Sequence, residues 1–409
     1  MLIIENATLL DLVNGDEKPG FHIAVDGSAI VAVSERPISS DAATRIDLRG
    51  QWLLPGLIDA HFHAVITETN PAHSRDLPPT LMTARAGTLL RNALLRGFTT
   101  VRDMGGADWG LRAATAEGAL LGSRLFIAGR AMSQTGGHGD LRRRTESDSE
   151  CNCAHALAYM SVITDGVCEV RRAAREQLRQ GADHLKVFIS GGVVSPSDPL
   201  TSAQYTEEEL GAIVHEARSW GSYVAAHAYT ADAISRAVVS GVRTIEHGNL
   251  LDAPSAALMA THGAFLVPTL VTYDVMQKHG ASLRLTQASL EKLRTVIKAG
   301  IESVELALAA GVAVGFGTDL LGAMHAYQSD EFLIRARVQK CHEVLRSATE
   351  VNARILGQEG RLGVIAPGAT ADLVACVANP LRDLGVLGGQ GEGIRLIIKD
   401  GLIVKNASI

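Results

Sequence analysis

The chain of 409 residues is 46% hydrophobic and 20% charged, which is typical of a folded globular protein. Its length exceeds what one simple core usually supports, so we expect a large domain accompanied by a smaller one. The net charge of −6 is dispersed without a long basic run, and no apolar run approaches the ~18 residues of a membrane span, so neither nucleic acid nor a membrane is an expected partner.

The N-terminal segment, MLIIENATLLDLVNGDEKPG, lacks the basic start and the small-residue cleavage site of a signal peptide. The five cysteines are odd in number and irregularly spaced, as expected for reduced thiols. These features predict a cytoplasmic protein.

The two ends of the chain share one pattern. Residues 1–54 alternate short apolar strands with turns, and the same pattern returns in residues 362–409, as in GVIAPGATADLVACV. Such alternation is typical of antiparallel sheet. The simplest arrangement pairs both ends into one small β-sandwich domain, with residues 55–361 inserted between them as a second domain.

Between the ends, apolar strands alternate with amphipathic helices, the pattern of repeated βα units. The eight expected strands cover residues 56–64, 98–104, 124–132, 184–190, 223–228, 244–247, 265–270 and 312–318. One of the helices between them starts after Thr206 and carries Glu209 three residues later, the pattern of a capping box. Eight βα units predict an α/β fold, a distorted (β/α)8 TIM barrel whose active site lies at the carboxyl ends of the strands.

The longest irregular stretch, residues 133–164, follows the third expected strand and contains TGGHGD and a basic run at 142–144. Loops of this length are usually lids, binding loops or disordered segments. Its CNCAH sequence, with Cys151, Cys153 and His155, could bind a metal, but no second ligand pair follows at finger-like spacing. We therefore expect a thiol-containing loop there.

Polar side chains occupy the carboxyl ends of five expected strands. These residues are His61, His63, Lys186, His227, His247 and Asp319. Side chains alternate along a strand, so His61 and His63, two residues apart, point the same way. If the strands close into one barrel, all of these groups converge on one mouth and could hold two divalent metal ions and an activated water. The pattern indicates a hydrolase.

Each of these residues also has a structural alternative. Lys186 could form a salt bridge with Asp319 or Glu246, or, deprotonated by burial, react with CO2 to give a carbamate that bridges two metal ions. Asp319 could cap a helix, or ligate metal and accept a proton from bound water. His227 and His247 could each be a core histidine, but their equivalent positions at strand ends favour ligation.

Several motifs carry a family resemblance. The segments PGLIDAHFH, AHAY, EHGN and GTD, with a lysine in the fourth expected strand, resemble the amidohydrolase superfamily, in its imidazolonepropionase-like branch with binuclear metal centres. More specifically, SQTGGHGD, VPTLVTYD and GFGTDLLG are similar to bacterial metal-dependent Xaa-Pro dipeptidases of the prolidase type. The resemblance covers nearly the whole chain.

This resemblance implies a role for each motif residue. His61, His63 and Asp319 would bind the more buried metal ion, with zinc expected at both sites. Carboxylated Lys186 would bridge the two ions, and His227 and His247 would bind the more exposed one. His138 and Tyr229 would hold the substrate carboxylate or polarise its carbonyl; alternatively, His138 stabilises a glycine-rich loop and Tyr229 packs at the rim.

The implied reaction is hydrolysis of an amide bond, with Asp319 as base and then acid and Tyr229 as a hydrogen-bond donor to the oxyanion. The expected substrate is a dipeptide or N-acyl amino acid with a free C-terminal carboxylate, Xaa-Pro foremost. We also expect a homo-oligomer.

Three alternatives stay open at this point. The first is a carboxypeptidase-like enzyme for a C-terminal arginine or lysine, whose cationic side chain Glu68, Asp140 or Asp198 could receive, or for the phenylalanine of an N-acyl toxin. The second is a cyclic-amide hydrolase of the imidazolone type. The third is a barrel that only binds, which would hold no zinc and an unmodified Lys186.

Overall fold

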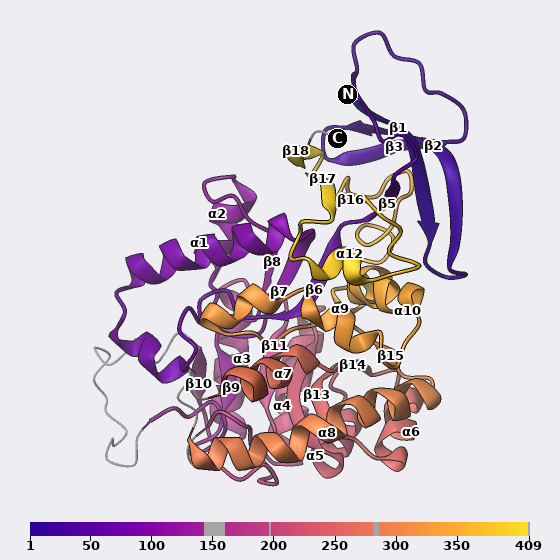
Figure 1. Cartoon of the computed structure of the whole chain (residues 1–409). Helices are drawn as coiled ribbons and strands as arrows, with labels where there is room; N and C mark the ends of the chain where they lie inside the picture. The colour runs from indigo at the N-terminus through magenta and orange to yellow at the C-terminus, as the bar shows by residue number, and fades with distance from the viewer. Residues whose placement is uncertain (143–159, 196–197, 281–285, 408–409) are drawn as a thin grey trace.

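The computed structural model describes residues 1–142, 160–195, 198–280 and 286–407 (Figure 1). Cys151, Cys153 and His155, as well as Arg143 and Arg144, lie outside these residues. Within the described ranges, no helix combines the length and the apolar character needed to cross a membrane.

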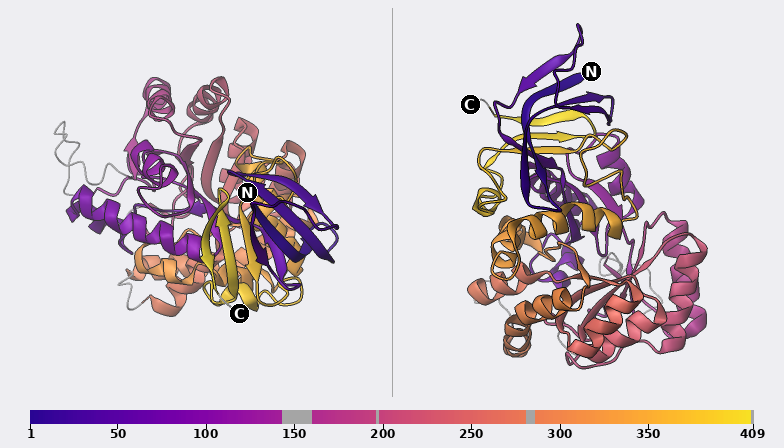
Figure 2. Two further views of the ribbon diagram at one scale, coloured as in Figure 1. Left: turned by 90° about the horizontal axis from the view of Figure 1, so that it is seen from above. Right: turned by 90° about the vertical axis from the view of Figure 1, so that its right-hand side faces the viewer.

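Strands from both ends of the chain form one eight-stranded mixed sheet. Its members are β1 (Leu2–Asp11), β2 (Asp16–Asp26), β3 (Ala29–Ser34), β4 (Thr44–Asp47), β5 (Trp52–Pro55), β16 (Leu373–Cys376), β17 (Ile394–Lys399) and β18 (Leu402–Asn406). β5 and β16 join the two ends in antiparallel pairing, with Leu53 opposite Ala375. In both views of Figure 2, the indigo and yellow strands accordingly lie side by side.

The segment between these ends contains two parallel sheets. The three-stranded sheet is β6 (Leu57–Phe62), β7 (Phe98–Asp103) and β8 (Arg124–Ile127). The seven-stranded sheet, in spatial order, is β10 (Ser161–Ile163), β9 (Ala131–Ser133), β11 (Leu185–Phe188), β12 (Val224–Thr230), β13 (Thr244–Leu250), β14 (Phe265–Val267) and β15 (Ala313–Val314). Almost every residue of β6, β7 and β11–β14 is buried, as expected for parallel strands covered on both faces.

Backbone hydrogen bonds connect β6 with the segment that follows β15. The amide of Ala60 donates to the Phe316 carbonyl at 2.8 Å, and the amide of Asp319 donates to the His61 carbonyl at 2.8 Å. The first and last parallel strands of the segment are therefore neighbours, although they are more than 250 residues apart.

Twelve α-helices occur in the described residues, and the longer ones surround the parallel strands (Figure 1). They are α1 (Pro79–Leu95), α2 (Trp109–Ala116), α3 (Gly166–Arg179), α4 (Glu207–Ser219), α5 (Ala231–Ser240), α6 (Ala253–His262), α7 (Leu270–His279), α8 (Gln287–Ala309), α9 (Asp330–Arg335), α10 (Cys341–Arg346), α11 (Asn352–Ile355) and α12 (Gly385–Gly388). The predicted capping box is confirmed, because Thr206 accepts from the Glu209 amide and the Glu209 carboxylate accepts from the Thr206 amide.

Two expected strands differ from the prediction. The single strand over residues 124–132 is wrong: the chain forms β8 and β9, separated at Gly129, which has a φ of 65° and a carbonyl that accepts from Gly106. A Cβ at Gly129 would lie 2.5 Å from Gln177 Oε1, so glycine permits this close approach. The last expected strand is regular only at Ala313–Val314, because the amide of Phe316 then turns to the Asn352 side chain.

Candidate metal centre

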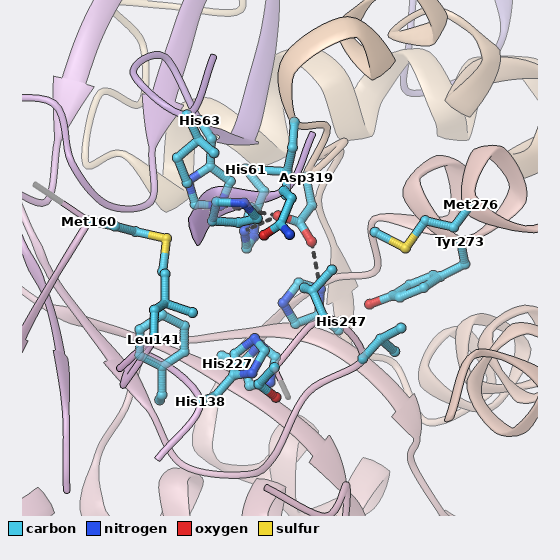
Figure 3. A pocket seen from close by; sticks show the side chains of 18 of the residues that line it. His61, His63, His138, Leu141, Met160, His227, His247, Tyr273, Met276 and Asp319 are labelled. Atoms are coloured by element: carbon cyan, nitrogen blue, oxygen red, sulfur yellow. Dashed lines mark ion pairs between the residues drawn. The ribbon is translucent and has the colours of Figure 1, made fainter. Parts of the chain in front are cut away.

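A cavity of about 430 Å³ opens at the carboxyl ends of the parallel strands (Figure 3). All eight residues that the sequence predicted for the site line this cavity: His61, His63, His138, Lys186, His227, Tyr229, His247 and Asp319. They come from β6 and the residue directly after it, from β11, β12 and β13, from the segment after β15 and from the loop after β9. The structure thus brings together groups that are up to 258 residues apart in the sequence.

Asp319 is the residue around which three histidines gather. Its Oδ1 lies 3.1 Å from His63 Nε2 and 3.3 Å from His61 Nε2, and its Oδ2 lies 3.8 Å from His247 Nδ1. One ligand atom each of His61, His247 and Asp319 can be chosen so that all lie within 4.8 Å of one another. Imidazole nitrogens and a carboxylate at these separations are a suitable donor set for zinc or a related divalent ion.

Burial and charge set the protonation of these groups. Burial would raise the pKa of Asp319, but the adjacent His61, His63 and His247 hold it well below its ordinary value. Burial lowers the pKa of His227 and His247 well below the ordinary value. The carboxylate is therefore ionised and both imidazoles are neutral, which are the protonation states that bind metal.

One ring nitrogen of each of three histidines has a further partner. Nδ1 of His61 lies 2.8 Å from Glu246 Oε2, Nε2 of His227 lies 3.1 Å from the Gly191 carbonyl, and Nδ1 of His247 lies 2.8 Å from Thr269 Oγ1. Each contact fixes the ring orientation and leaves the other nitrogen for a ligand, as in metal-binding histidines generally.

The backbone around the ligand candidates is unusual. His247, within β13, and Asp319, after β15, have φ values of 73° and 51°, in the left-handed region that side chains seldom adopt. Such conformations concentrate at functional sites. Glycine permits a second close approach, since a Cβ at Gly317 would lie 2.7 Å from His61 Cβ.

Lys186 is almost fully buried on β11, and burial lowers its pKa to about 8. The predicted alternative of a salt bridge finds no support: in the described part of the chain, no carboxylate oxygen lies within ion-pair distance, 4.0 Å, of its Nζ. Glu246 instead accepts from Arg102 at 2.8 Å. The Lys186 amine therefore lines the cavity without forming an ion pair to a described carboxylate, although Glu246 and Asp319 act on its pKa from a greater distance.

His138 and Tyr229 adjoin the ligand candidates. The His138 ring is stacked on the His227 ring, with centroids 4.4 Å apart at 21°, and burial lowers its pKa to about 4. Tyr229 follows His227 by two residues on β12, so both side chains point into the cavity. The Tyr229 hydroxyl lies 2.7 Å from the Tyr273 hydroxyl. In Figure 3, Leu141 and Met160 flank the centre on one side, and Tyr273 and Met276 on the other.

Sequence analysis missed four residues that support the centre: Arg102, Glu246 in its supporting role, Thr269 and Tyr273. Arg102 had a usable signal, because an arginine inside the apolar strand FTTVRD must find a buried counterion. Thr269 and Tyr273 belong to VPTLVTYD, a motif noted for its resemblance but without an assigned role. Thr269 and Tyr273 lie before and within α7, and this helix packs against α8 and α9.

Comparisons with known proteins agree with this geometry. The model of the amidohydrolase family matches residues 52–403. The crystal structure of a prolidase complexed with N-methylphosphonate-L-proline is similar to this chain, with a TM-score of 0.97, 47% identity and 99% of each chain covered. A Xaa-Pro dipeptidase with bound methionine in its active site has a TM-score of 0.88 and 30% identity, over 99% of this chain and 100% of that one. The ochratoxinase of Aspergillus niger is 29% identical over 372 residues, which cover 87% of this chain and 76% of the relative.

Proposed function

Because this chain belongs to the amidohydrolase family, as its motifs predicted, we propose that it hydrolyses an amide bond in a small substrate at the centre around Asp319. The observation that carries this proposal is the convergence of three histidines on one carboxylate beside a buried, unpaired lysine.

The proposal includes the finer architecture. The hydrogen bonds between β6 and the segment after β15 support closure of the parallel strands into a distorted (β/α)8 barrel over residues 55–361. The pairing of β5 with β16 supports a small β-sandwich domain from residues 1–54 and 362–409. In such a barrel, the strand ends that carry the centre are the usual location of an active site.

We infer that this donor set holds two divalent metal ions, with zinc expected, and the cluster of His61, His247 and Asp319 supports metal binding. His61, His63 and Asp319 would hold one ion, His227 and His247 the other, and Lys186, carboxylated on Nζ, would bridge them. Bound metal ions supply a water molecule with a pKa lowered towards ~7 and polarise the substrate carbonyl. The unpaired amine of Lys186 supports the carbamate, because carboxylation would give this buried group the negative charge that metal ions neutralise.

The chain's own residues then move the protons. Asp319, ionised and beside the ligand histidines, accepts the proton of the attacking water and passes it to the departing nitrogen. Tyr229 donates a hydrogen bond to the oxyanion of the tetrahedral intermediate, and such a donor is worth ~3 kcal/mol. His138, stacked on His227, lies where it can contact the substrate carboxylate.

The favoured substrate is a dipeptide or N-acyl amino acid with a free C-terminal carboxylate, and Xaa-Pro is the first candidate. Similarity to a prolidase and to a Xaa-Pro dipeptidase supports proline. Similarity to an ochratoxinase keeps an N-acyl phenylalanine as the second candidate. A cyclic amide is a weaker alternative.

A cationic side chain at the C-terminal position is disfavoured. None of the three carboxylates considered for it, those of Glu68, Asp140 and Asp198, belongs to the described cavity lining. Glu68 is paired with Arg85, and Asp140 with Arg142 at 2.7 Å. Asp198 is buried and accepts from the Gly192 amide at 3.2 Å.

The test is a panel of dipeptides and N-acyl amino acids, assayed with zinc-loaded protein. We expect turnover of acyl-L-prolines and a large loss when the proline carboxylate is converted to an amide. Indifference to that carboxylate would contradict the dipeptidase proposal and favour the cyclic-amide alternative.

Asp319→Asn should abolish turnover while the protein stays folded; substantial residual turnover would exclude the acid–base role. A homo-oligomer and a cytoplasmic location stay predictions.

A further inference from the structure

Thr269 precedes α7 in an unexpected conformation. It is fully buried and has a φ of 49°, which is rare for a β-branched residue. A threonine before a helix usually caps it with its hydroxyl, but the Thr269 side chain does not cap α7. Its Oγ1 instead lies 2.8 Å from Nδ1 of His247, so the unusual backbone directs the hydroxyl towards the centre.

A residue from another helix caps α7 in place of Thr269. The amide of Val271 donates to Glu331 Oε2 at 2.7 Å. It is one of the first N–H groups of the helix, which need an acceptor from outside it. Since Glu331 of α9 supplies that acceptor, the Thr269 hydroxyl is available to His247.

Three hydroxyl groups, those of Thr269, Tyr273 and Tyr229, lead from His247 towards the cavity. Thr269 is the residue before α7, and Tyr273 lies in the first turn of this helix. Burial raises the pKa of the Tyr273 phenol, and the neighbouring Thr269 hydroxyl opposes this shift. The phenol oxygen of Tyr273 lies 2.7 Å from that of Tyr229. Tyr229 and Tyr273 are buried to the same degree as Thr269 and His247, with exposures of 3% or less. The four side chains thus connect a ligand candidate to the residue that faces the substrate.

The order of donors in this chain follows from the ring of His247. If Nε2 of His247 held a metal ion, Nδ1 would carry the proton and donate to Thr269. Each hydroxyl has a single proton, so Thr269 would donate to Tyr273 and Tyr273 would donate to Tyr229. The proton of Tyr229 would then have no acceptor among these four side chains and would be available to a group in the cavity that Tyr229 lines.

We propose that Thr269 and Tyr273 are positioning residues that present the Tyr229 hydroxyl as a hydrogen-bond donor to a tetrahedral, negatively charged group in the cavity. The identity of that group as the oxyanion of amide hydrolysis rests on the proposed function. The direction in which Thr269, Tyr273 and Tyr229 donate depends only on which His247 nitrogen carries the proton.

The first test measures binding and not turnover. The probe is N-methylphosphonate-L-proline, titrated by calorimetry into zinc-loaded protein whose metal content has been verified. Tyr273→Phe should weaken binding roughly three- to tenfold, the range for one lost neutral hydrogen bond. In a Tyr229→Phe background the same change should have no further effect. The proposal would be overturned if either Tyr273→Phe or Tyr229→Phe left the affinity unchanged. It would also be overturned if the loss of affinity in the double variant equalled the product of the two single losses.

A matched control removes a similar hydrogen bond elsewhere. Tyr205 is also buried, and its hydroxyl lies 2.8 Å from Thr164 Oγ1, outside the described cavity lining. Tyr205→Phe should therefore leave the affinity for the phosphonate unchanged. If it weakens binding as much as Tyr273→Phe does, the loss of affinity reflects a nonspecific disturbance of the protein structure, and the proposal fails.

The second test needs no substrate and separates this inference from the proposed function. The phenol carbons of Tyr229 and Tyr273 are observed by 13C NMR with and without zinc. Thr269→Val removes the hydroxyl between His247 and Tyr273 but keeps the branched shape of the side chain, and Thr269→Ser restores the hydroxyl. The change in the 13C chemical shift of Tyr229 on zinc binding should become smaller in the valine variant and return in the serine variant, even if no amide substrate is found. Equal responses in all three proteins would overturn the inference while leaving hydrolysis intact.

Discussion

Glu246 supports His61 from behind: its Oε2 accepts from His61 Nδ1 at 2.8 Å while its Oε1 accepts from Arg102 at 2.8 Å. All three side chains are buried, and Arg102 also donates to the Ala60 carbonyl on the strand that carries His61. The carboxylate therefore fixes both the orientation and the tautomer of a ligand candidate, and its charge is balanced by a buried guanidinium.

Replacing Glu246 with glutamine should weaken metal binding. Glutamine keeps the size of the side chain but removes the charge that stabilises His61 and Arg102. We expect zinc affinity, measured by competition with a chelator, to fall ~10- to 100-fold. The unfolding free energy should fall by up to ~3–5 kcal/mol, because Arg102 is left as a buried, uncompensated charge. The control is Glu216→Gln, whose partner Arg175 is largely exposed, and it should change neither quantity by more than ~1 kcal/mol. Unaltered zinc affinity in Glu246→Gln would contradict this supporting role.

Gly192 makes room for His138. A Cβ at this position would lie 2.0 Å from His138 Cε1, so Gly192→Ala must displace the imidazole from its stack on His227. A misplacement of about 1 Å can cost ~100-fold in rate, and we expect at least ~10-fold loss of kcat/KM on an acyl-proline. Gly211→Ala is the matched control, because its Cβ would meet no atom within 4 Å and alanine favours the helix. Equal activity of the two variants would show that His138 is not needed in this position.

The residues of the centre were predictable because each lies at a strand end. Alternation along β6 places His61 and His63 on one face, and the carboxyl ends of parallel strands share one edge of the sheet. The supporting residues could not be found in this way. Tyr273 reaches Tyr229 only through the packing of α7, and the break at Gly129 depends on a contact with Gln177, 48 residues away. Glu331, which caps α7 from α9, has no local sequence signal either.

Glu331 should make the stability of the protein depend on pH. Burial, with a further contribution from Asp59, raises its pKa from 4.5 to about 8, although Arg335, 3.9 Å away, opposes this shift. A carboxyl with a raised pKa in the folded state holds its proton more tightly there than in the unfolded chain. Its contribution to stability is complete below the unfolded value of 4.5 and is lost as the pH rises to about 8.

Glu331→Gln removes this titration but keeps an oxygen that can accept from the Val271 amide. The unfolding free energy of the natural protein should fall more steeply than that of the variant between pH 4.5 and about 8. We expect a difference of at least ~1 kcal/mol, since one pKa unit corresponds to about 1.4 kcal/mol. Chemical denaturation across this pH range provides the measurement, and parallel pH profiles for the two proteins would exclude Glu331 as the source.

Lys186 gives the most direct check of the metal centre. Its neutral amine would add CO2 to form a carbamate with release of one proton, and its lowered pKa, about 8, keeps part of the amine neutral near pH 7. Zinc-loaded protein in 13C-labelled bicarbonate should show one carbamate signal by NMR, absent from Lys186→Ala. The variant should also lose zinc and turnover, and short carboxylic acids should restore part of both by occupying the space of the carbamate. Lys278→Ala, which removes a largely exposed lysine, is the control and should retain the signal. A zinc-loaded natural protein without the signal would mean that Lys186 serves the centre as an unmodified amine.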